Sequence, residues 1–323
     1  MDILCSTDNN YIMPTGIMLT SLLVNNSGTD ITIHVMIDNT VTEDSKKSLS
    51  SVTHSYGARI EFYLMDKRLF DNFPLGKDYQ SSHITTMATY YRLFAHKVLP
   101  PHLNKVIYLD GDIIVRHSLN DLWNIGMTNC PIAGVPDIQC YSVLHYNRLH
   151  YSMQLGYFNA GVLLINLEYW RNNSVLDDFI RVIDEKRSVL SCHDQDVLNY
   201  CFRENKMLLP IKYNMQTGFL YRRELVPLPW SLDYQIDEGQ RDPAIIHFIT
   251  FPKPWNSDCN HPYKPEFISY RNKTEWRNSK EHRYYHGRSR LYWAIVKTAI
   301  KLGISKQSND PDTYFSENLN VLY

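Results

Sequence analysis

Residues 105–112 read KVIYLDGD, an apolar run that leads directly into two aspartates separated by one glycine. The run predicts a buried strand over residues 105–109, and ligands of open α/β sheets bind beyond the carboxyl ends of their strands. Asp110 and Asp112, turned together by Gly111, can both reach one hard divalent cation, and Mg²⁺ or Mn²⁺ held there can bridge the phosphates of a nucleotide. The alternative for so short a motif is an ordinary solvated turn.

The apolar pattern from the amino terminus to residue 64 alternates between strand and helix in the order βαβαβ, which indicates a parallel sheet. Residues 71–86 lack periodicity and contain Pro74 and Gly76, so a long loop is expected there. The expected strands are residues 2–6, 30–37, 59–64, 105–109, 132–135, 160–166 and 244–249, and the expected helices are residues 11–24, 43–52, 87–99, 177–185 and 194–202.

The composition excludes several classes of protein. The 33 basic and 34 acidic residues give a formal net charge of −1, which excludes a broadly basic nucleic-acid binder, and a hydrophobic content of 44% excludes a largely disordered chain. The sequence has no GxGxxG after the first strand, no GxxxxGK[ST] and no GxSxG, which argues against dinucleotide redox enzymes, P-loop enzymes and α/β-hydrolases. No secretory signal, CxxC pair or long apolar run is visible, so we expect a reduced, cytoplasmic protein.

Four further polar groups are candidates for a functional site. They are His247 with Lys253 after the last expected strand, HDQD at 193–196, FNAG at 158–161 and STDNN at 6–10. Each motif also has an ordinary structural interpretation. His247 could be a core histidine, and HDQD could supply the acids that cap a helix. FNAG could simply begin a strand, and STDNN could be an N-cap cluster. An imidazole is acceptable to Mn²⁺ and less natural for Mg²⁺, and Lys253 could meet a phosphate as a point charge.

Taken together and in this order, the motifs resemble the family 8 glycosyltransferases, and above all the bacterial lipopolysaccharide α-galactosyltransferases and α-glucosyltransferases. The resemblance covers about residues 1–260 and implies a GT-A fold, a mixed and mainly parallel nucleotide-binding sheet flanked by helices, here followed by a C-terminal helical segment. The matching motifs are STDNNY (6–11), ITTMATYYRL (84–93), YLDGDIIV (108–115), YFNAGVLLINL (157–167), HDQDVLN (193–199) and HFITFPKPW (247–255).

The resemblance implies a role for each matching residue. Asp110, Asp112 and His247 are implied as ligands of Mn²⁺, with Mg²⁺ as the second choice. Gln195 and Asp194 are implied beside the reacting sugar, and Asp137 facing the acceptor. The implied donor-binding residues are Ser6, Asp8 and Asn10 at the uridine, Lys253 at the diphosphate, and Arg92, Asp110, Asn159, Ala160 and Asp194. Thr250 stands where the family commonly has a glycine against the phosphate, which narrows that part of the pocket.

The resemblance further implies that the protein transfers galactose or glucose from UDP-galactose or UDP-glucose to a saccharide acceptor, in lipopolysaccharide or surface glycan synthesis, with retention of anomeric configuration. Double displacement and same-face attack both remain open. The amide of Gln195 is a poor nucleophile, and Asp194 or Asp196 could take its place only by moving, so the same-face route is favoured because no well-placed carboxylate is evident. Two other functions remain open: a nucleotide-sugar binding module without turnover, and a self-glycosylating protein like the glycogenins, for which the 23 tyrosines offer acceptors.

The composition changes after residue 270. Residues 271–306 contain ten basic and two acidic residues, and apolar side chains recur at 291, 295, 299 and 302 with helical spacing. A basic amphipathic helix with Tyr and Trp is typical of a membrane-surface element, and the alternative is a helix that packs on the catalytic domain. We expect a GT-A catalytic domain over 1–270, a segment over 271–306 that attaches the protein to the anionic inner leaflet through 283–306, and a polar tail over 307–323.

Overall fold

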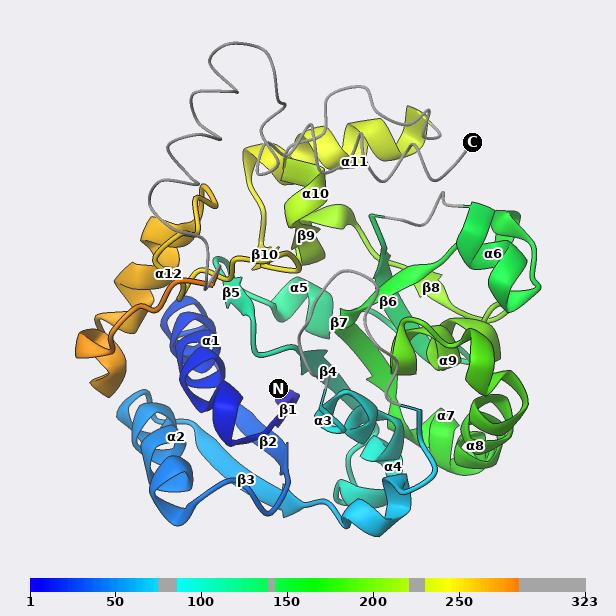
Figure 1. The fold of residues 1–323 in the computed structure, drawn as a ribbon, viewed down its shortest axis with the longest axis horizontal. Helices are drawn as coiled ribbons and strands as arrows, with labels where there is room; N and C mark the ends of the chain where they lie inside the picture. Colours follow the sequence, from blue (N-terminus) through cyan, green and yellow to red (C-terminus); the bar gives the residue numbers. More distant parts are fainter. Residues whose placement is uncertain (75–85, 139–142, 221–229, 285–323) are drawn as a thin grey trace.

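The computed structural model describes residues 1–74, 86–138, 143–220 and 230–284, which form an α/β fold around a central sheet (Figure 1). Within these residues the central sheet has seven strands in the order β3-β2-β1-β4-β7-β6-β8. The strands are β1 (Asp2–Thr7), β2 (Thr32–Ile37), β3 (Arg59–Leu64), β4 (Lys105–Leu109), β6 (Ile132–Pro136), β7 (Phe158–Asn166) and β8 (Met207–Leu208).

The parallel amino-terminal part of the sheet, predicted from the βαβαβ order, is confirmed. β2 pairs in parallel with β1 and β3, and β1 pairs in parallel with β4, with Ile3 opposite Ile107. β7 runs antiparallel to β4 and β6, so the sheet is mixed. Because β1 and β4 are parallel neighbours, the loops that follow Thr7 and Leu109 meet at the same edge of the sheet.

The central strands feed two hydrophobic cores, because successive side chains of a strand point to opposite faces. In β4, Ile107 and Leu109 belong to one core, whereas Val106 and Tyr108 belong to the other. Helices that contribute to the first core are α1 (Ile12–Asn25), α2 (Glu43–Ser55), α5 (Asn120–Trp123), α10 (Thr217–Leu220), α11 (Trp230–Arg241) and α12 (Lys264–Arg271). Those of the second core are α3 (Ala88–Tyr91), α4 (Ala95–Val98), α6 (Val143–Leu149), α7 (Leu167–Asn172), α8 (Val175–Lys186) and α9 (His193–Cys201).

Residues 87–99, predicted as one helix, are instead broken into α3, a 3₁₀ turn over Arg92–Phe94, and α4. The tighter turn falls at Arg92, whose buried side chain reaches Asp110 at the end of β4. Most of the predicted loop over 71–86 lies outside the described residues.

A second, three-stranded sheet within the described part of the chain has the order β5-β10-β9. Its strands are β5 (Ile113–Val115), β9 (Met215–Gln216) and β10 (Ile245–His247). The strand predicted over 244–249 is only three residues long, although the amide of Phe248 still donates in the same register to the carbonyl oxygen of Asp112 at 3.0 Å. β10 runs antiparallel to β5 with His247 opposite Ile113, which brings this histidine beside the turn that follows β4.

The chain after α12, orange in Figure 1, remains packed on the domain. Trp276, in a 3₁₀ turn over Glu275–Asn278, lies so close to α1 that a Cβ atom on Gly16 would stand 2.1 Å from its ring. The domain boundary expected after residue 270 thus falls within packed structure. The helix predicted around residues 291–302 and the tail over 307–323 lie outside the described residues. No helix among the described residues has the length and apolar character needed to cross a membrane.

His96 of α4 is a buried histidine in the second core. Its ring lies edge-on to Trp170 of α7, with 5.6 Å between the ring centroids. Within the described parts of the chain, neither ring nitrogen has a hydrogen-bond partner. Burial, aided by the positive charges of Lys97 and Arg171, lowers the pKa of His96 to about 4.

We expect the free energy of unfolding to decrease as the pH falls from about 6.5 towards 4, because the unfolded chain protonates His96 before the folded protein does. Between pH 7 and pH 5, protonation of His96 should lower the free energy of unfolding by about 1 kcal/mol. This figure is smaller than the full linkage effect because solvent screens part of the interaction. Urea unfolding of the wild-type protein and of His96→Leu at both pH values measures this contribution. The decrease in the free energy of unfolding from pH 7 to pH 5 should be smaller in His96→Leu than in the wild type. Equal decreases in the two proteins would show that His96 is not responsible.

Candidate functional site

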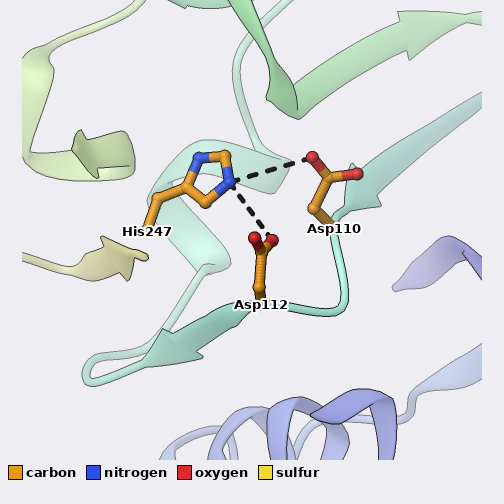
Figure 2. A group of neighbouring side chains, drawn as sticks. All are labelled: Asp110, Asp112 and His247. Atoms are coloured by element: carbon orange, nitrogen blue, oxygen red, sulfur yellow. Dashed lines mark ion pairs between the residues drawn. The ribbon is translucent and has the colours of Figure 1, made fainter. Parts of the chain in front are cut away.

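Three candidate metal ligands meet at the turn between β4 and β5 (Figure 2). Nε2 of His247 lies 3.3 Å from Oδ1 of Asp112 and 3.8 Å from Oδ2 of Asp110. One ligand atom from each residue lies within 4.8 Å of the other two. Two carboxylates and one imidazole form a donor set that fits Mn²⁺, and the carboxylates also suit Mg²⁺. The structure thus brings together the three residues that the sequence predicts at one metal site.

The tautomer of His247 is set by a chain of hydrogen bonds that begins at Asp137. The Asp137 carboxylate only accepts, so Nδ2 of Asn159 must face it, at 3.0 Å from Oδ2. Oδ1 of Asn159 then accepts from Nδ2 of Asn214 at 2.9 Å, and also from the amide of Gly161. Oδ1 of Asn214 is left to accept from Nδ1 of His247 at 3.0 Å. The proton therefore sits on Nδ1, and the lone pair of Nε2 points to the two aspartates.

Gly161 in the FNAG motif is required by the crowding around the metal cluster. A Cβ atom at this position would lie 2.2 Å from Cε1 of His247 and 2.9 Å from Oδ2 of Asp110. Its carbonyl oxygen also accepts the amide of Asp110 at 2.8 Å, so the backbones of β4 and β7 hold the first aspartate in place. Any side chain at this position would displace a candidate metal ligand.

Lys253 is a buried cation on the other side of Asp112. Its Nζ lies 2.7 Å from Oδ2 of Asp112 and also donates to the carbonyl oxygen of Phe248. Burial opposes ionisation of Asp112, but the ammonium group of Lys253 holds the pKa of its carboxyl well below its usual range. Asp112 therefore remains an anionic ligand throughout the physiological range.

Arg92 joins the metal turn to the start of α9. Its Nη2 lies 2.9 Å from Oδ1 of Asp110, and its Nε lies 3.0 Å from Oδ2 of Asp194. The guanidinium carbon stands 4.0 Å above the ring of Tyr108, which adds a cation–π contact. Burial raises the pKa of Asp194, although Arg92 and the hydroxyl of Thr89 act in the opposite direction. The Arg92 side chain also donates to the carbonyl oxygen of Ala160, so β7 shares in the same network.

Gln195 is held with its amide in one orientation. Its Oε1 accepts the backbone amide of Ala160 at 2.9 Å, and its Nε2 donates to Oδ2 of Asp137 at 3.2 Å. Asp137 thus binds both Gln195 and Asn159, which places the predicted acceptor residue directly beside the predicted reaction centre.

Asp196, the second acid of HDQD, is saturated with hydrogen bonds. It is fully buried and accepts two contacts from the guanidinium of Arg148 on α6. The hydroxyl of Tyr157 and the amide of Cys192 complete its shell, each at 2.7 Å. Arg148 and Tyr157 received no role from the sequence, since a lone Arg on a helix and a Tyr just before a strand carry no local signal of such a contact. The arrangement makes Asp196 an anchor for α9 rather than a free carboxylate.

A cleft of about 550 Å³ opens over the metal turn. Of the predicted residues, it is lined by Ser6, Asp8, Arg92, Asp110, Asp112 and Lys253. The side chain of Asp8 accepts the amides of Asn10 and Tyr11, which fixes the loop after β1. Asn10 is exposed and outside the cleft lining, and the lining also does not include His247, Asn159, Ala160, Asp137, Asp194 or Gln195.

Aromatic residues that the sequence did not single out complete the cleft wall. They are Tyr11, Tyr108, Phe251, Trp255 and Tyr284. Tyr11 packs edge-on to Trp255, with ring centroids 5.5 Å apart, so the loops after β1 and β10 support each other. Another hollow, beside α6, is lined by Tyr146, His150 and Tyr151 and contains none of the predicted site residues.

Comparisons with known proteins agree with the motif pattern. The model of glycosyl transferase family 8 matches residues 2–259. General stress protein A of Bacillus subtilis (strain 168) is 31% identical over 280 residues, which cover 85% of this chain and 94% of that protein. A lipopolysaccharide 1,2-glucosyltransferase of Escherichia coli is 28% identical over 274 residues, which cover 84% of this chain and 78% of that protein.

A solved structure resembles the whole arrangement of sheet and helices. The galactosyltransferase LgtC, in complex with donor and acceptor sugar analogs, superimposes with a TM-score of 0.75 at 24% identity, over 85% of this chain and 96% of that chain. The likeness shows the GT-A fold that the motifs predict.

We expect Asn214→Ala to weaken Mn²⁺ binding by about 10- to 100-fold, because His247 loses the partner that fixes its ring and tautomer. Titration of the protein with Mn²⁺, followed by the electron paramagnetic resonance signal of the free ion, measures the affinity. Asn205→Ala is the matched control, since its side-chain amide donates to the carbonyl oxygen of Asn129 at an exposed position. Wild-type affinity in Asn214→Ala would disprove the role given to this residue.

Proposed function

This chain belongs to glycosyl transferase family 8, and from that premise we propose that it transfers galactose or glucose from UDP-galactose or UDP-glucose to a saccharide acceptor, with retention of anomeric configuration. Lipopolysaccharide or another surface glycan is the proposed destination of the sugar, since related proteins include a lipopolysaccharide 1,2-glucosyltransferase and a lipopolysaccharide 1,3-galactosyltransferase.

The observation that carries this proposal is the meeting of three groups in one cleft. The end of β1 and the loop after it, with Ser6 and Asp8, form one part of the wall, and Lys253 forms another. Between them are the two aspartates of the DGD turn, backed by His247. These positions match the parts of a nucleotide-sugar: a uridine beside Ser6 and Asp8, a diphosphate beside Lys253, and a sugar toward Arg92.

Asp110, Asp112 and His247 are the residues proposed to hold Mn²⁺, with Mg²⁺ as the second choice. Their fit rests on the donor set and on the Nε2 lone pair that Asn214 directs toward the carboxylates. A divalent ion held there supplies positive charge opposite the diphosphate leaving group.

Lys253 and Arg92 are fixed cations of the same site. Because both are buried and hydrogen-bonded, their charges are oriented before the donor binds, and such preorganised charge is usually the largest contribution to catalysis. We propose that Lys253 binds the diphosphate and that Arg92, paired with Asp110 and Asp194, orients the sugar.

The carboxylates near the reaction centre favour same-face attack over double displacement. Asp194 is paired with Arg92, and Asp196 is enclosed by Arg148, Tyr157 and the Cys192 amide. Either would have to break these contacts to attack an anomeric carbon. In the same-face route the departing diphosphate accepts the proton of the acceptor hydroxyl, while Gln195 and Asp137 position the two sugars.

We expect the full chain to release UDP from UDP-galactose or UDP-glucose in the presence of Mn²⁺, and EDTA to stop the reaction. Asp112→Asn should reduce the rate by at least about 100-fold, because the cleft loses one anionic ligand. UDP release is followed by a coupled assay, and binding of UDP with Mn²⁺ by thermal shift.

Asp44→Asn is the matched control, because its side chain is 91% exposed at the start of α2, and its activity should equal that of the wild type. UDP-sugar binding without any release of UDP would indicate a binding module. No release and no thermal shift with either donor would exclude the proposed function.

We also propose a revised arrangement of the carboxyl-terminal region. The catalytic domain extends to residue 284, because the described residues 271–284 pack on it. The attachment segment then comprises residues 285–306, which contain five basic and no acidic residues and the apolar positions at helical spacing. Residues 307–323 remain the polar tail. We propose that the attachment segment binds the anionic inner leaflet through its basic and aromatic side chains.

We expect the combined variant Arg288→Glu, Arg290→Glu and Lys297→Glu to bind anionic vesicles on the order of 100-fold more weakly, since each basic residue near such a surface contributes about 1 kcal/mol. Sedimentation with phosphatidylserine vesicles measures binding, and UDP release in solution should not change. The control reverses three exposed lysines of the catalytic domain, Lys47, Lys67 and Lys97. Equal vesicle binding by both variants would mean that the segment does not attach the protein.

A further inference from the structure

Residues 275–284, here called the strap, follow α12 (Figure 1) and end at Tyr284, which lines the cleft. At one end, Trp276 packs against Gly16 of α1. In the middle, Glu281 accepts Nζ of Lys264 at 2.9 Å and Nη1 of Arg271 at 3.0 Å. At the other end, Tyr284 is part of the cleft wall. The strap lies entirely beyond residue 259, where the match to the family model ends.

The strap is bonded to residues 250–258, here called the Lys253 loop. The carbonyl oxygen of His282 accepts the amide of Ser257 at 3.1 Å and the side-chain amide of Asn256 at 3.3 Å. The amide of Tyr284 donates to Oδ1 of Asp258 at 3.0 Å. The two segments therefore form a short parallel bridge rather than a chance side-chain contact.

Aromatic stacking continues this bridge into the cleft. The ring of Tyr284 stacks on that of Phe251, with centroids 4.9 Å apart and an angle of 18° between the planes. Nζ of Lys253 lies 4.7 Å from the centroid of the same Phe251 ring. Tyr284, Phe251 and Lys253 thus form a continuous set of contacts, from the strap to the cation proposed to bind the diphosphate.

We propose that the strap braces the Lys253 loop through the Tyr284–Phe251 stack, so that tight binding of the nucleoside diphosphate depends on Tyr284. Tyr284 is a positioning residue that acts on Lys253 through Phe251. The consequence for the donor rests on the function proposed above, whereas the bracing of the loop does not.

The test compares full-length Tyr284→Ala and Tyr284→Phe with the wild type, and Tyr234→Ala serves as control because that ring is 70% exposed on α11. Hydrogen–deuterium exchange of residues 250–258, without ligand, should be about fivefold faster in Tyr284→Ala, as expected for the loss of one aromatic pair. Tyr284→Phe keeps the stack and should exchange like the wild type.

Binding of UDP with Mn²⁺, measured by calorimetry, should be about fivefold weaker in Tyr284→Ala and unchanged in Tyr284→Phe and Tyr234→Ala. In the activity assay, KM for the donor should rise by a similar factor while kcat changes less.

Unchanged exchange over residues 250–258 in Tyr284→Ala would overturn the bracing, and faster exchange with unchanged UDP affinity would overturn its consequence for the donor. Absence of UDP binding by the wild type would reject the proposed function instead, and the exchange comparison would still decide the bracing.

Discussion

The carboxylate of Asp137 can only accept hydrogen bonds, and that restriction sets the direction of every bond between it and the metal cluster. Asn159 and Asn214 each have one possible orientation as a result, and His247 receives one tautomer. The same carboxylate also accepts Nε2 of Gln195. The residue predicted to face the acceptor, the residue predicted beside the reacting sugar and the histidine predicted to bind the metal are therefore parts of one hydrogen-bonded unit.

Buried charge gives this unit its chemical character. Arg92, Lys253, Asp112 and Asp194 are all buried, and each charge faces an opposite one. Burying a charge is costly unless it is paired, so removing one partner would leave an uncompensated charge in the floor of the cleft. These side chains are therefore held in position before any ligand binds, because each is already paired with one of opposite charge. Gly161 allows this density, because its missing side chain leaves the space that His247 and Asp110 occupy.

The sequence predicts six of the seven described strands of the central sheet because each of them carries a strong local signal, whereas the two-residue β8 is too short to carry one. KVIYL and VLLIN are buried on both faces, and their apolar runs locate β4 and β7 closely. Asp110, Asp112 and His247 could be grouped because their motifs match a family. Asn214, Arg148 and Tyr157 could not, since their roles arise from contacts across 33 to 55 residues of sequence. The change of composition at residue 271 also suggested a separate segment, but Arg271 and Lys264 pair with Glu281, which keeps the following residues on the domain.

The position of the strap has a consequence for the order of synthesis. A growing chain completes β1, β4 and the DGD turn early, whereas Tyr284 emerges 172 residues after Asp112. Domains begin to fold from the amino terminus while they are being made. The nascent protein therefore has its DGD turn long before its cleft gains the last aromatic wall, and the Lys253 loop, once made, stays unsupported until the strap follows it. The proposed donor site is in this sense completed late in the life of the chain, only when residues 275–284 return to meet α1.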